Sequence, residues 1–292
     1  MAELLWTGRL PDAVPTWPEP DADLAGAIRR MLAAAPRLDP LARLTTATMA
    51  ASAGHGNDDP PTAARRLIAL APGVTADPTI ATREPLPGTS TAHRLAVAWH
   101  ADPSEQLVHA LQRALVLLAD HELATSTLAV RVAGSVRADP YSAFAAGLAV
   151  LRSPLHGSTA EAVHGLLARC EISGVTPCIR DQLDATARLP GFGHSIYRGD
   201  DPRVAPLLEA VRSLDDPAGR MHVVEHLLEE TGRSVTVRPN VDLAIGALSF
   251  VGRLAPDVPV FAVARLAGWA AHLDEELTER PLRFRGIARS AS

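Results

Sequence analysis

The chain has 292 residues, enough to bury a large core as one two-lobed unit or as two domains. Its 28 basic and 33 acidic residues give a net charge of −5, so it lacks the basic surplus that nucleic-acid binding requires. The most apolar segment, residues 143–151, is much shorter than the roughly 20 residues of a membrane-spanning helix.

The first residues are acidic and apolar, and residues 10–20 are rich in proline, which is unlike a secretory signal. We therefore expect a cytoplasmic protein that contacts neither nucleic acid nor membrane. Alanine and leucine dominate the rest, and alternation typical of strands is confined to short pieces such as 234–237, so the pattern predicts an all-α fold. Two segments rich in glycine, asparagine, aspartate and proline, 55–61 and 71–87, are predicted to be loops.

A helix is predicted to begin at residues 102–105, which resemble a capping box with Pro103 at the first helical position. Apolar side chains then recur at helical spacing along one face: Leu107, Leu111, Ala114, Leu115 and Leu118. This helix leads to an Asp-His-Glu segment that contains His121, and a second histidine, His156, follows in a Pro-Leu-His-Gly loop. A single histidine at a helix end usually caps the helix or is solvated, so neither is diagnostic alone.

Two patterns raise the question of redox or metal chemistry. Cys170 and Cys178 are the only cysteines, and their spacing matches neither a zinc pair nor a thioredoxin-type motif. We expect free thiols, with a disulfide bridge as the less favoured alternative. His222 and His226 form a His-x-x-Glu-His pattern like that of inverted zinc proteases. A zinc site would need a third ligand from another helix, so an amphipathic helix without metal is favoured.

Residues 189–203 are the most informative segment. His194 follows a Gly-Phe-Gly turn at 191–193, and Arg203 follows an Asp-Pro pair at a helix start. Glycine lets the backbone approach a ligand closely, and an arginine fork binds a carboxylate through two parallel hydrogen bonds. The combination suits a small dianionic acid held beside a larger, phosphate-bearing partner. An ordinary turn followed by a capped helix is the alternative for this segment alone.

An aspartate, Asp242, comes next, after a Pro-Asn turn and before an apolar run. In this order, the Asp-His-Glu, Pro-Leu-His-Gly, Pro-Gly-Phe-Gly-His…Asp-Pro-Arg and Pro-Asn-Val-Asp segments resemble the citrate synthase family. The resemblance continues weakly at residues 5–11 and resumes at 261–269 and 279–281, so it extends over nearly the whole chain.

The resemblance implies an all-α, citrate synthase-like fold with two domains and the active site in the cleft between them. Residues 1–158 and 258–292 would form the large helical domain, and residues 159–257 the small domain. Closure of the cleft would assemble the site and exclude water. The resemblance also implies a homodimer, because Arg280 matches an arginine that reaches the active site of the neighbouring subunit.

The implied reaction joins the methyl carbon of a short acyl-CoA, acetyl-CoA, to the keto carbon of an α-keto acid, oxaloacetate, and yields citrate and CoA. Asp242 matches the base that removes the weakly acidic proton beside the thioester, and His156 matches the group that stabilises the enol or enolate. His194 would donate to the keto oxygen, which becomes an alkoxide. The CoA thioester is a substrate, and no cofactor or metal is expected.

Further residues match binding positions of the family. His121, Arg203 and Arg265 match groups that contact the keto acid, and Ser126 matches a serine that orients the enol-stabilising histidine. The residues expected near the CoA substrate are Gly191, Phe192, Gly193, Arg198 and Asn240.

Several positions depart from the family pattern, in particular Ala124, where an asparagine is usual, and residues 158–160, where Gly-Ala-Asn is usual. The residues concerned in this second segment are Ser158, Thr159 and Ala160, and further departures are Ser153, Ser195 and Val235. Arg233 and Arg238 could replace a phosphate-binding lysine that Val235 does not supply. The three catalytic side chains remain, so the substrate is left open rather than the mechanism. The alternatives are a 2-methylcitrate synthase, a specialised-metabolism homologue with other substrates, or a non-catalytic partner of a full-length paralogue.

Overall fold

The computed structural model describes residues 1–13, 15, 17, 19–80, 88–153, 157, 159–193, 197, 199–234 and 237–284. Over these residues the fold is all-α, as predicted, with fourteen helices and no β-strand. The helices are α1 (Ala2–Thr7), α2 (Ala22–Ala33), α3 (Pro40–His55), α4 (Pro60–Thr75), α5 (Thr91–Trp99), α6 (Glu105–Leu118), α7 (Thr125–Ser135), α8 (Pro140–Leu151), α9 (Thr159–Ser173), α10 (Val175–Thr186), α11 (Val204–Arg212), α12 (Arg220–Ser234), α13 (Val241–Val251) and α14 (Val260–Thr278). None of these helices is long and apolar enough to cross a membrane.

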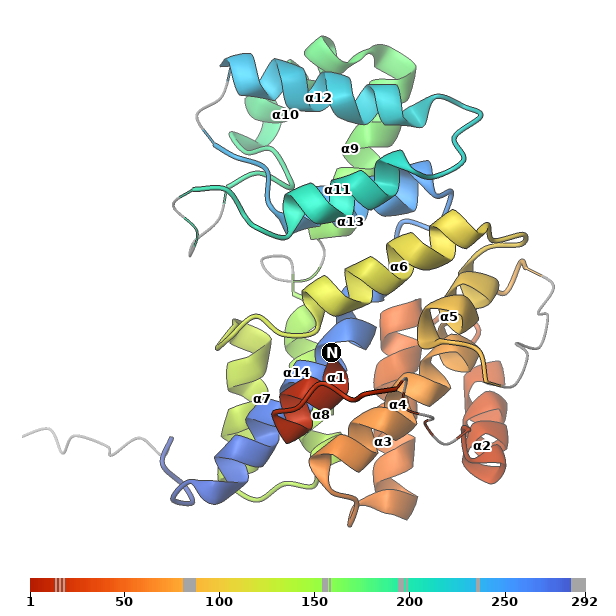
Figure 1. Ribbon diagram of the computed structural model, residues 1–292, viewed down its shortest axis with the longest axis vertical. Helices are drawn as coiled ribbons and strands as arrows, with labels where there is room; N and C mark the ends of the chain where they lie inside the picture. Colours follow the sequence, from red (N-terminus) through yellow and green to blue (C-terminus); the bar gives the residue numbers. More distant parts are fainter. Residues whose placement is uncertain are drawn as a thin grey trace, which may run out of the picture.

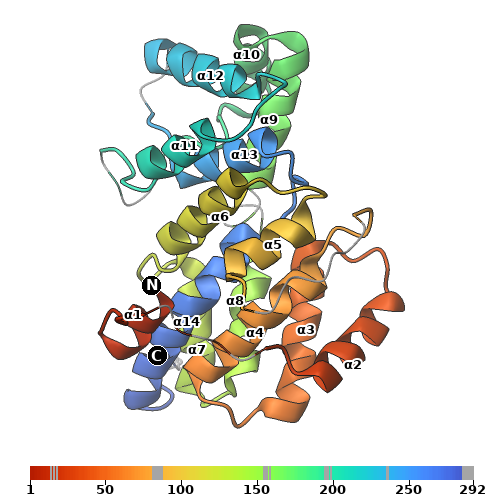
Figure 2. The same cartoon turned by 45° about the vertical axis from the view of Figure 1, so that its right-hand side comes forward.

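Helices α9 to α13 lie together at one end of the molecule, and the other helices form the larger part (Figure 1 and Figure 2). Helix α11 packs against α6 and joins the two groups. Helix α14 runs through the larger part, where it contacts α1, α4, α6, α7 and α8. Because α13 belongs to one group of helices and α14 to the other, a site built from both lies between the two groups.

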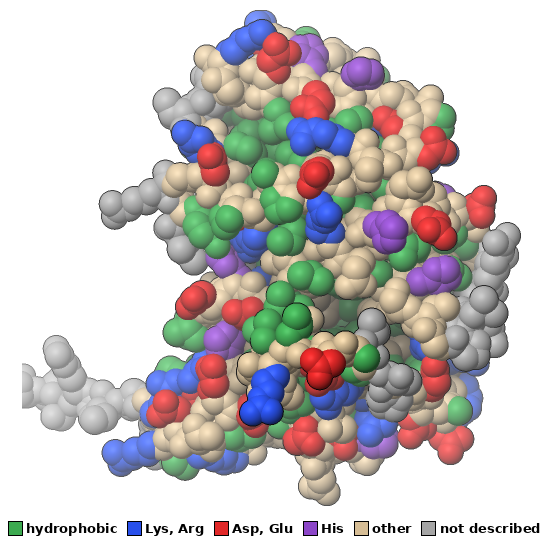
Figure 3. Space-filling model, viewed as in Figure 1, with side chains coloured by type: hydrophobic (Ala, Val, Ile, Leu, Met, Phe, Trp, Pro, Cys, Tyr) green, Lys and Arg blue, Asp and Glu red, His purple; other side chains and the backbone are tan. Residues whose placement is uncertain are grey.

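On the face drawn in Figure 3, the described charged side chains of both signs are interspersed, without a large basic patch.

Helices α13 and α14 are apolar on almost all sides because neighbouring helices enclose them. Every residue of α13 except Asp242 is buried. Helix α14 buries twelve residues, and only two of these, Arg265 and Glu276, are charged. Charged groups inside such helices are costly unless they are paired or serve a ligand, so Asp242 and Arg265 require an explanation.

Helix α6 begins later than the sequence pattern suggested. The N-cap is Ser104, whose hydroxyl accepts a hydrogen bond from the backbone N–H of Leu107 at 3.2 Å, so Pro103 precedes the helix. Aspartate and serine are both good capping residues. Ser104 caps α6 because its hydroxyl bonds the backbone N–H three residues later, at Leu107. The predicted apolar face is confirmed, since Leu107, Leu111, Ala114 and Leu118 are buried and Leu115 packs beside them.

The predicted loop at 71–87 is wrong in its first part, because α4 continues through Pro72 to Thr75. Proline removes one backbone hydrogen bond from the helix, but tertiary contacts hold this last turn. Trp99 Nε1 donates to Thr75 Oγ1 at 3.0 Å, and Arg43 Nη1 donates to Ala76 O at 2.9 Å. Residues 81–87 lie outside the described residues. The other predicted loop is shorter than expected, because α3 ends at His55 and α4 begins at Pro60.

Candidate functional site

The Gly-Phe-Gly turn and the Pro-Asn turn are paired side by side, which places the start of α13. Phe192 and Pro239 form an isolated antiparallel bridge. Asn240 joins the two turns, because its backbone N–H donates to Gly191 O at 2.9 Å and its side-chain Nδ2 donates to Gly193 O at 2.7 Å. Asn240 Oδ1 also accepts from the backbone N–H of Asp242 at 3.0 Å and caps α13. These contacts place Asp242 in the first turn of that helix.

The two glycines of the turn serve different purposes, although both have positive φ, 81° at Gly191 and 83° at Gly193. A Cβ on Gly191 would lie 2.7 Å from Val163 Cγ2 and 3.0 Å from Leu243, whereas a Cβ on Gly193 would meet nothing within 4 Å. Gly191 is therefore required for packing between α9 and α13, and only Gly193 faces open space that a ligand could enter.

This difference predicts unequal effects of two alanine substitutions. We expect Gly193→Ala to lower the free energy of unfolding by about 1–2 kcal/mol, the cost of left-handed backbone alone. Gly191→Ala should lower the free energy of unfolding by about 1–3 kcal/mol more, because the new methyl group also overlaps Val163 and Leu243. Urea denaturation of both variants measures the difference, and equal losses would contradict the packing role of Gly191.

Asp242 has the chemistry of a base. No described residue donates a hydrogen bond to its carboxylate, and burial raises its pKa to about 6, although the positive charge of Arg203 opposes the shift. A carboxylate without partners in an apolar surrounding binds a proton more strongly than one in water. Asp242 is therefore ionised at neutral pH and more basic than an ordinary aspartate.

Arg203 is held by an aspartate that the sequence patterns did not single out. Its Nε and Nη2 donate to the two oxygens of Asp201 at 2.9 and 2.8 Å, and Asp201 Oδ2 also accepts from the backbone N–H of Val241 at 3.0 Å. Burial raises the pKa of Asp201, but the hydrogen bonds from Arg203 outweigh this and hold that pKa below its ordinary value. The pair links the start of α11 to the start of α13, and only Nη1 of Arg203 lies outside it.

Arg265 is fully buried, and two of its donors have no partner in the part of the chain that the structure describes. Its Nε donates to Leu118 O at 3.1 Å, and its side chain lies over the Phe261 ring at 4.7 Å. Nη1 and Nη2 have no hydrogen-bond acceptor among the described residues, although both are buried. Burial lowers the pKa of Arg265 to about 10, with Asp120 opposing and Arg203 adding to the shift. Two parallel N–H groups in a dry site match the oxygens of a carboxylate.

His121 and Arg203 both lie against the aromatic ring of Tyr197. Tyr197 stacks on the His121 ring with 5.7 Å between centroids, and the Arg203 guanidinium lies 5.6 Å from the Tyr197 centroid. The charge of Arg203 also acts on Asp242 and Arg265, so these three predicted residues share one electrostatic neighbourhood, and His121 is linked to it through Tyr197. Tyr197 was missed by sequence reasoning, although its position inside the segment 189–203 was a usable signal.

Other predicted residues lie outside the described residues or apart from this group. His156, His194 and Arg198 fall outside the described residues, and so do the departures Ser158, Ser195 and Val235. Ser126 is fully buried in the first turn of α7, and its contact with His156 stays a prediction. Ala124 occupies the N-cap position of α7 and makes no side-chain capping bond. Arg233 and Arg238 are exposed and pair with acidic residues, Glu229 and Asp200 respectively.

Arg280 lies apart from Arg265 along the same polypeptide. It follows the end of α14 and is exposed, whereas Arg265 is in the second turn of that helix. Thr278 lies thirteen positions after Arg265 in the helix, which places it about 20 Å further along the helix axis, and Arg280 lies beyond it. Arg280 therefore does not contribute to the group around Arg265 of its own chain.

The patterns considered for metal and redox chemistry have structural roles. His222 and His226 are exposed on α12 while Val224 and Leu227 are buried, so the amphipathic-helix interpretation is confirmed. The described residues contain no group of three or more histidine, cysteine, aspartate or glutamate side chains placed to hold a metal ion. Cys170 and Cys178 are buried free thiols on α9 and α10, as expected.

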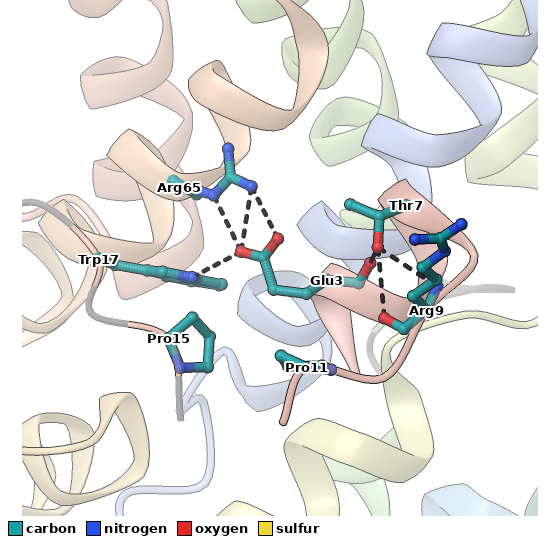
Figure 4. A pocket seen from close by; sticks show the side chains of 7 residues that line it. All are labelled: Glu3, Thr7, Arg9, Pro11, Pro15, Trp17 and Arg65. Carbon is teal, nitrogen blue, oxygen red and sulfur yellow. Dashed lines mark hydrogen bonds and ion pairs between the residues drawn. The ribbon is translucent and has the colours of Figure 1, made fainter. Parts of the chain in front are cut away.

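A separate hollow of about 480 Å³ lies beside α1 and is lined by Glu3, Thr7, Arg9, Pro11, Pro15, Trp17 and Arg65 (Figure 4). Glu3 points between Arg65 and Trp17 and accepts hydrogen bonds from both at 2.9 to 3.1 Å. Glu3 and Arg65 thus pair with each other, and the hollow shares no residue with the group around Arg265.

Comparison with known proteins adds to this geometry. A family model described as citrate synthase, C-terminal domain, matches residues 1–289. Citrate synthase 2 of Bacillus subtilis (strain 168) is 34% identical over 181 residues, which are 60% of this chain and 49% of that protein. 2-Methylcitrate synthase 1 of Corynebacterium glutamicum is 32% identical over 180 residues, 59% of this chain and 46% of that protein. The chain spans about half the length of these curated relatives.

The fold has counterparts among solved structures. The ternary complex of citrate synthase from Thermoplasma acidophilum with carboxymethyl coenzyme A and oxaloacetate matches with a TM-score of 0.74. The match covers 98% of this chain and 83% of that one, at 24% sequence identity. This likeness establishes the fold.

Proposed function

Because this chain belongs to the citrate synthase family, we propose that it condenses a short acyl-CoA, acetyl-CoA, with the α-keto acid oxaloacetate to give citrate and CoA. The observation that carries the proposal is the carboxylate of Asp242, which has no hydrogen-bond donor among the described residues, together with the buried guanidinium of Arg265; the charge of Arg203 acts on both. The first group is suited to remove a proton, and the second to hold a carboxylate of the acceptor.

The first step is removal of a methyl proton from the acyl-CoA by Asp242. Its raised pKa brings it closer in basicity to a weakly acidic carbon acid than an ordinary aspartate would be. His156 donates to the thioester oxygen, where the enolate charge develops. The enolate carbon then bonds to the keto carbon, and His194 gives a proton to the resulting alkoxide. Water finally cleaves the thioester, which releases citrate and CoA as the thiol.

The keto acid is oriented by fixed positive charge. Nη1 and Nη2 of Arg265 bind one carboxylate, and this supplies the acceptor that those buried donors lack among the described residues. Arg203, held rigid by Asp201, and His121, stacked on Tyr197, contact the remainder of the acid. Because these side chains are held in place, they orient the keto acid and lower the entropic cost of bringing it together with the acyl-CoA.

The CoA substrate is proposed to enter over the paired turns. Gly193 faces open space there, and Asn240 fixes the turn by its hydrogen bond to Gly193 O. Phe192 and Arg198 complete this side of the site. The division into a large domain, 1–158 and 258–292, and a small domain, 159–257, would place Asp242 and Arg265 on opposite sides of the cleft. That placement is supported by the separate grouping of α9 to α13. A cytoplasmic location stays a prediction.

We also propose a homodimer formed through α7. Three apolar side chains recur at a spacing of four along its surface and at its end, and they are exposed by 40% at Leu128, 46% at Val132 and 57% at Val136. The segment that carries Arg280 adjoins this helix, because Leu282 N donates to Ser135 O at 2.8 Å. A second copy on this face would lie next to Arg280, which supports its role in the partner's site. Closed two-fold interfaces of this kind pair the same surface on both subunits.

A charge on this surface tests the dimer. We expect Val132→Asp to convert the protein to a monomer and to lower condensation activity strongly, because each site loses the neighbour's Arg280. Ile172→Asp is the matched control, since Ile172 is 86% exposed on α9, away from α7. Analytical ultracentrifugation measures the assembly state, and a fully active monomer would refute the role of Arg280.

The choice of acyl-CoA tests the proposed substrate. Release of the CoA thiol by the purified protein with oxaloacetate should be faster with acetyl-CoA than with propionyl-CoA. The similarity to a 2-methylcitrate synthase favours propionyl-CoA as the alternative. One additional methylene changes discrimination by only about 1–3 kcal/mol, so the ratio of kcat/KM values has to be measured rather than a single rate. Release from neither thioester would contradict the proposed reaction.

A further inference from the structure

The turn that follows α6 is fastened to one face of α14. The last residue of α6 and the two residues after it are contacted in order by three residues of this face: Leu118 O by Arg265 Nε at 3.1 Å, Ala119 O by Gly268 N at 2.9 Å, and Asp120 Oδ1 by His272 Nε2 at 3.1 Å. The next residue of the turn is His121. The position of His121 therefore depends on how firmly α14 holds the three residues before it.

The approach of the turn to α14 is very close at its centre. A Cβ on Gly268 would lie 2.4 Å from Ala119 O and 2.7 Å from Asp120 Oδ1, so glycine is required there. Arg265, which we propose to bind the keto acid, and His272 are two helical turns apart on this same face. Arg265 and His272 thus lie at the two ends of the contact between α14 and residues 118–120.

His272 is placed to be an imidazolium. Its Nε2 faces Asp120 Oδ1 and its Nδ1 faces Glu275 Oε2, each at 3.1 Å. Carboxylate oxygens only accept hydrogen bonds, so both ring nitrogens must carry protons for both bonds to form. The hydrogen bond to Asp120 is the main cause that raises the pKa of His272 above its ordinary value, and Glu275 adds to it. Burial raises the pKa of Asp120, but the hydrogen bond from His272 outweighs it and keeps that pKa low.

The charged groups around this histidine come from three elements. Asp120 lies on the turn, Glu275 on α14 itself, and Arg131 on α7 donates to Glu275 Oε2 at 2.7 Å and to His272 O at 3.4 Å. Arg131 Nε also donates to Glu276 Oε2 at 2.9 Å. Glu276 in turn pairs with Arg283 in the segment that carries Arg280. The chain of contacts therefore extends from the His121 turn to the carboxyl-terminal segment.

We propose that His272 is a positioning residue for the acceptor site, whose imidazolium holds Asp120 and thereby fixes the turn that presents His121 to the keto acid. It does not touch the substrate. This role rests on the proposed function, since it concerns the binding of the keto acid in that same site.

A dependence on pH follows from this role. A histidine whose pKa is raised by acidic partners contributes fully below its ordinary pKa of about 6.5, and the contribution is lost as the pH rises through the raised value. Affinity for the keto acid should therefore fall on the alkaline side of neutrality. The same fall should not occur when residue 272 keeps a donor for Asp120 but cannot titrate.

Calorimetric binding of oxaloacetate between pH 6 and 9 tests this without requiring turnover, in the wild type and in His272→Gln. The glutamine amide can still donate to Asp120 but carries no titratable proton. We expect the ratio of the wild-type Kd to the His272→Gln Kd to rise about ten-fold from pH 6 to pH 9. This is the effect of losing one charge-assisted hydrogen bond when His272 of the wild type loses its proton. Taking the ratio cancels the titration of the other histidines. Circular dichroism at each pH confirms that both proteins stay folded.

Two further variants sharpen the outcome. His226→Gln, at an exposed position of α12, should follow the wild-type curve. His272→Ala, which lacks a donor, should bind oxaloacetate about ten-fold more weakly than the wild type at pH 6. A constant ratio for His272→Gln, or wild-type affinity for His272→Ala at pH 6, would overturn the positioning role alone. No binding of oxaloacetate by the wild type at any pH would overturn the proposed function and this role with it.

Discussion

Replacing Asp242 with asparagine should lower the rate of condensation by about 10² to 10⁴-fold, the range that a positioned general base contributes. Asparagine keeps the shape of the side chain but cannot accept the methyl proton. In the wild type, the rate should also fall as the pH drops below about 6, because Asp242 becomes protonated there. Steady-state thiol release across pH 5 to 8 measures both effects.

The same substitution should stabilise the folded chain. The pKa of Asp242 is about 6 in the folded chain instead of the ordinary 3.8. At neutral pH the ionised carboxylate therefore lowers the free energy of unfolding by about 2–3 kcal/mol, and this loss is absent at a pH below both values. Asp242→Asn removes it. Asp184→Asn, at an exposed position of α10, is the matched control and should change neither rate nor stability. A variant at 242 that keeps its activity would remove Asp242 from the role of base.

Replacing Arg265 with lysine should raise the KM for oxaloacetate by about 100-fold or more and leave the KM for acyl-CoA nearly unchanged. Lysine retains the charge but loses the parallel Nη1 and Nη2 donors, and each charge-assisted hydrogen bond contributes about 1.5–3 kcal/mol. It also loses the bond from Nε to Leu118 O. Kinetics at varied oxaloacetate with saturating acyl-CoA give the KM.

Arg233→Lys is the matched control for this arginine. Arg233 is exposed on α12 and its ion pairs with Glu229 and Glu230 are at the surface, where such pairs contribute little. We expect wild-type KM values for both substrates in this variant. An Arg265→Lys protein with unchanged affinity for the keto acid would show that the acceptor carboxylate binds elsewhere.

The parts of this structure that could be predicted from sequence depend on local rules. The apolar spacing of α6 and the apolar run of α13 each lie within one helix, so their pattern is visible without the fold. The error at Pro72 has the opposite cause. Trp99 and Arg43, which hold the last turn of α4, are separated from it by more than twenty residues, and no local signal records such contacts.

The site shows the same division. His121, Arg203, Asp242 and Arg265 were expected together because their motifs resemble one family in order. The structure brings the last three into one electrostatic neighbourhood and links His121 to Arg203 through Tyr197. The partners that tune them were not predictable. His272 lies 152 residues from Asp120 in sequence, and Asp201 is linked to Val241 across 40 residues. Which carboxylate pairs with which cation is decided by packing, not by spacing along the chain.

The departures from the family pattern concern hydrogen bonds rather than reactive groups. Ala124 leaves α7 without a side-chain cap, and helices usually gain about 1 kcal/mol from such a cap. This loss is at the start of the helix that we propose to form the dimer interface. It leaves the carboxylate of Asp242 and the guanidinium of Arg265 in place.

The most direct test combines two products of one reaction. Purified protein is mixed with acetyl-CoA and oxaloacetate, and citrate is quantified by mass spectrometry while the CoA thiol is measured in the same sample. We expect citrate and thiol to appear in equal amounts, at a rate that falls by about 10² to 10⁴-fold in Asp242→Asn. Thiol without citrate, or neither product above the level without protein, would contradict a condensing site built on Asp242 and Arg265.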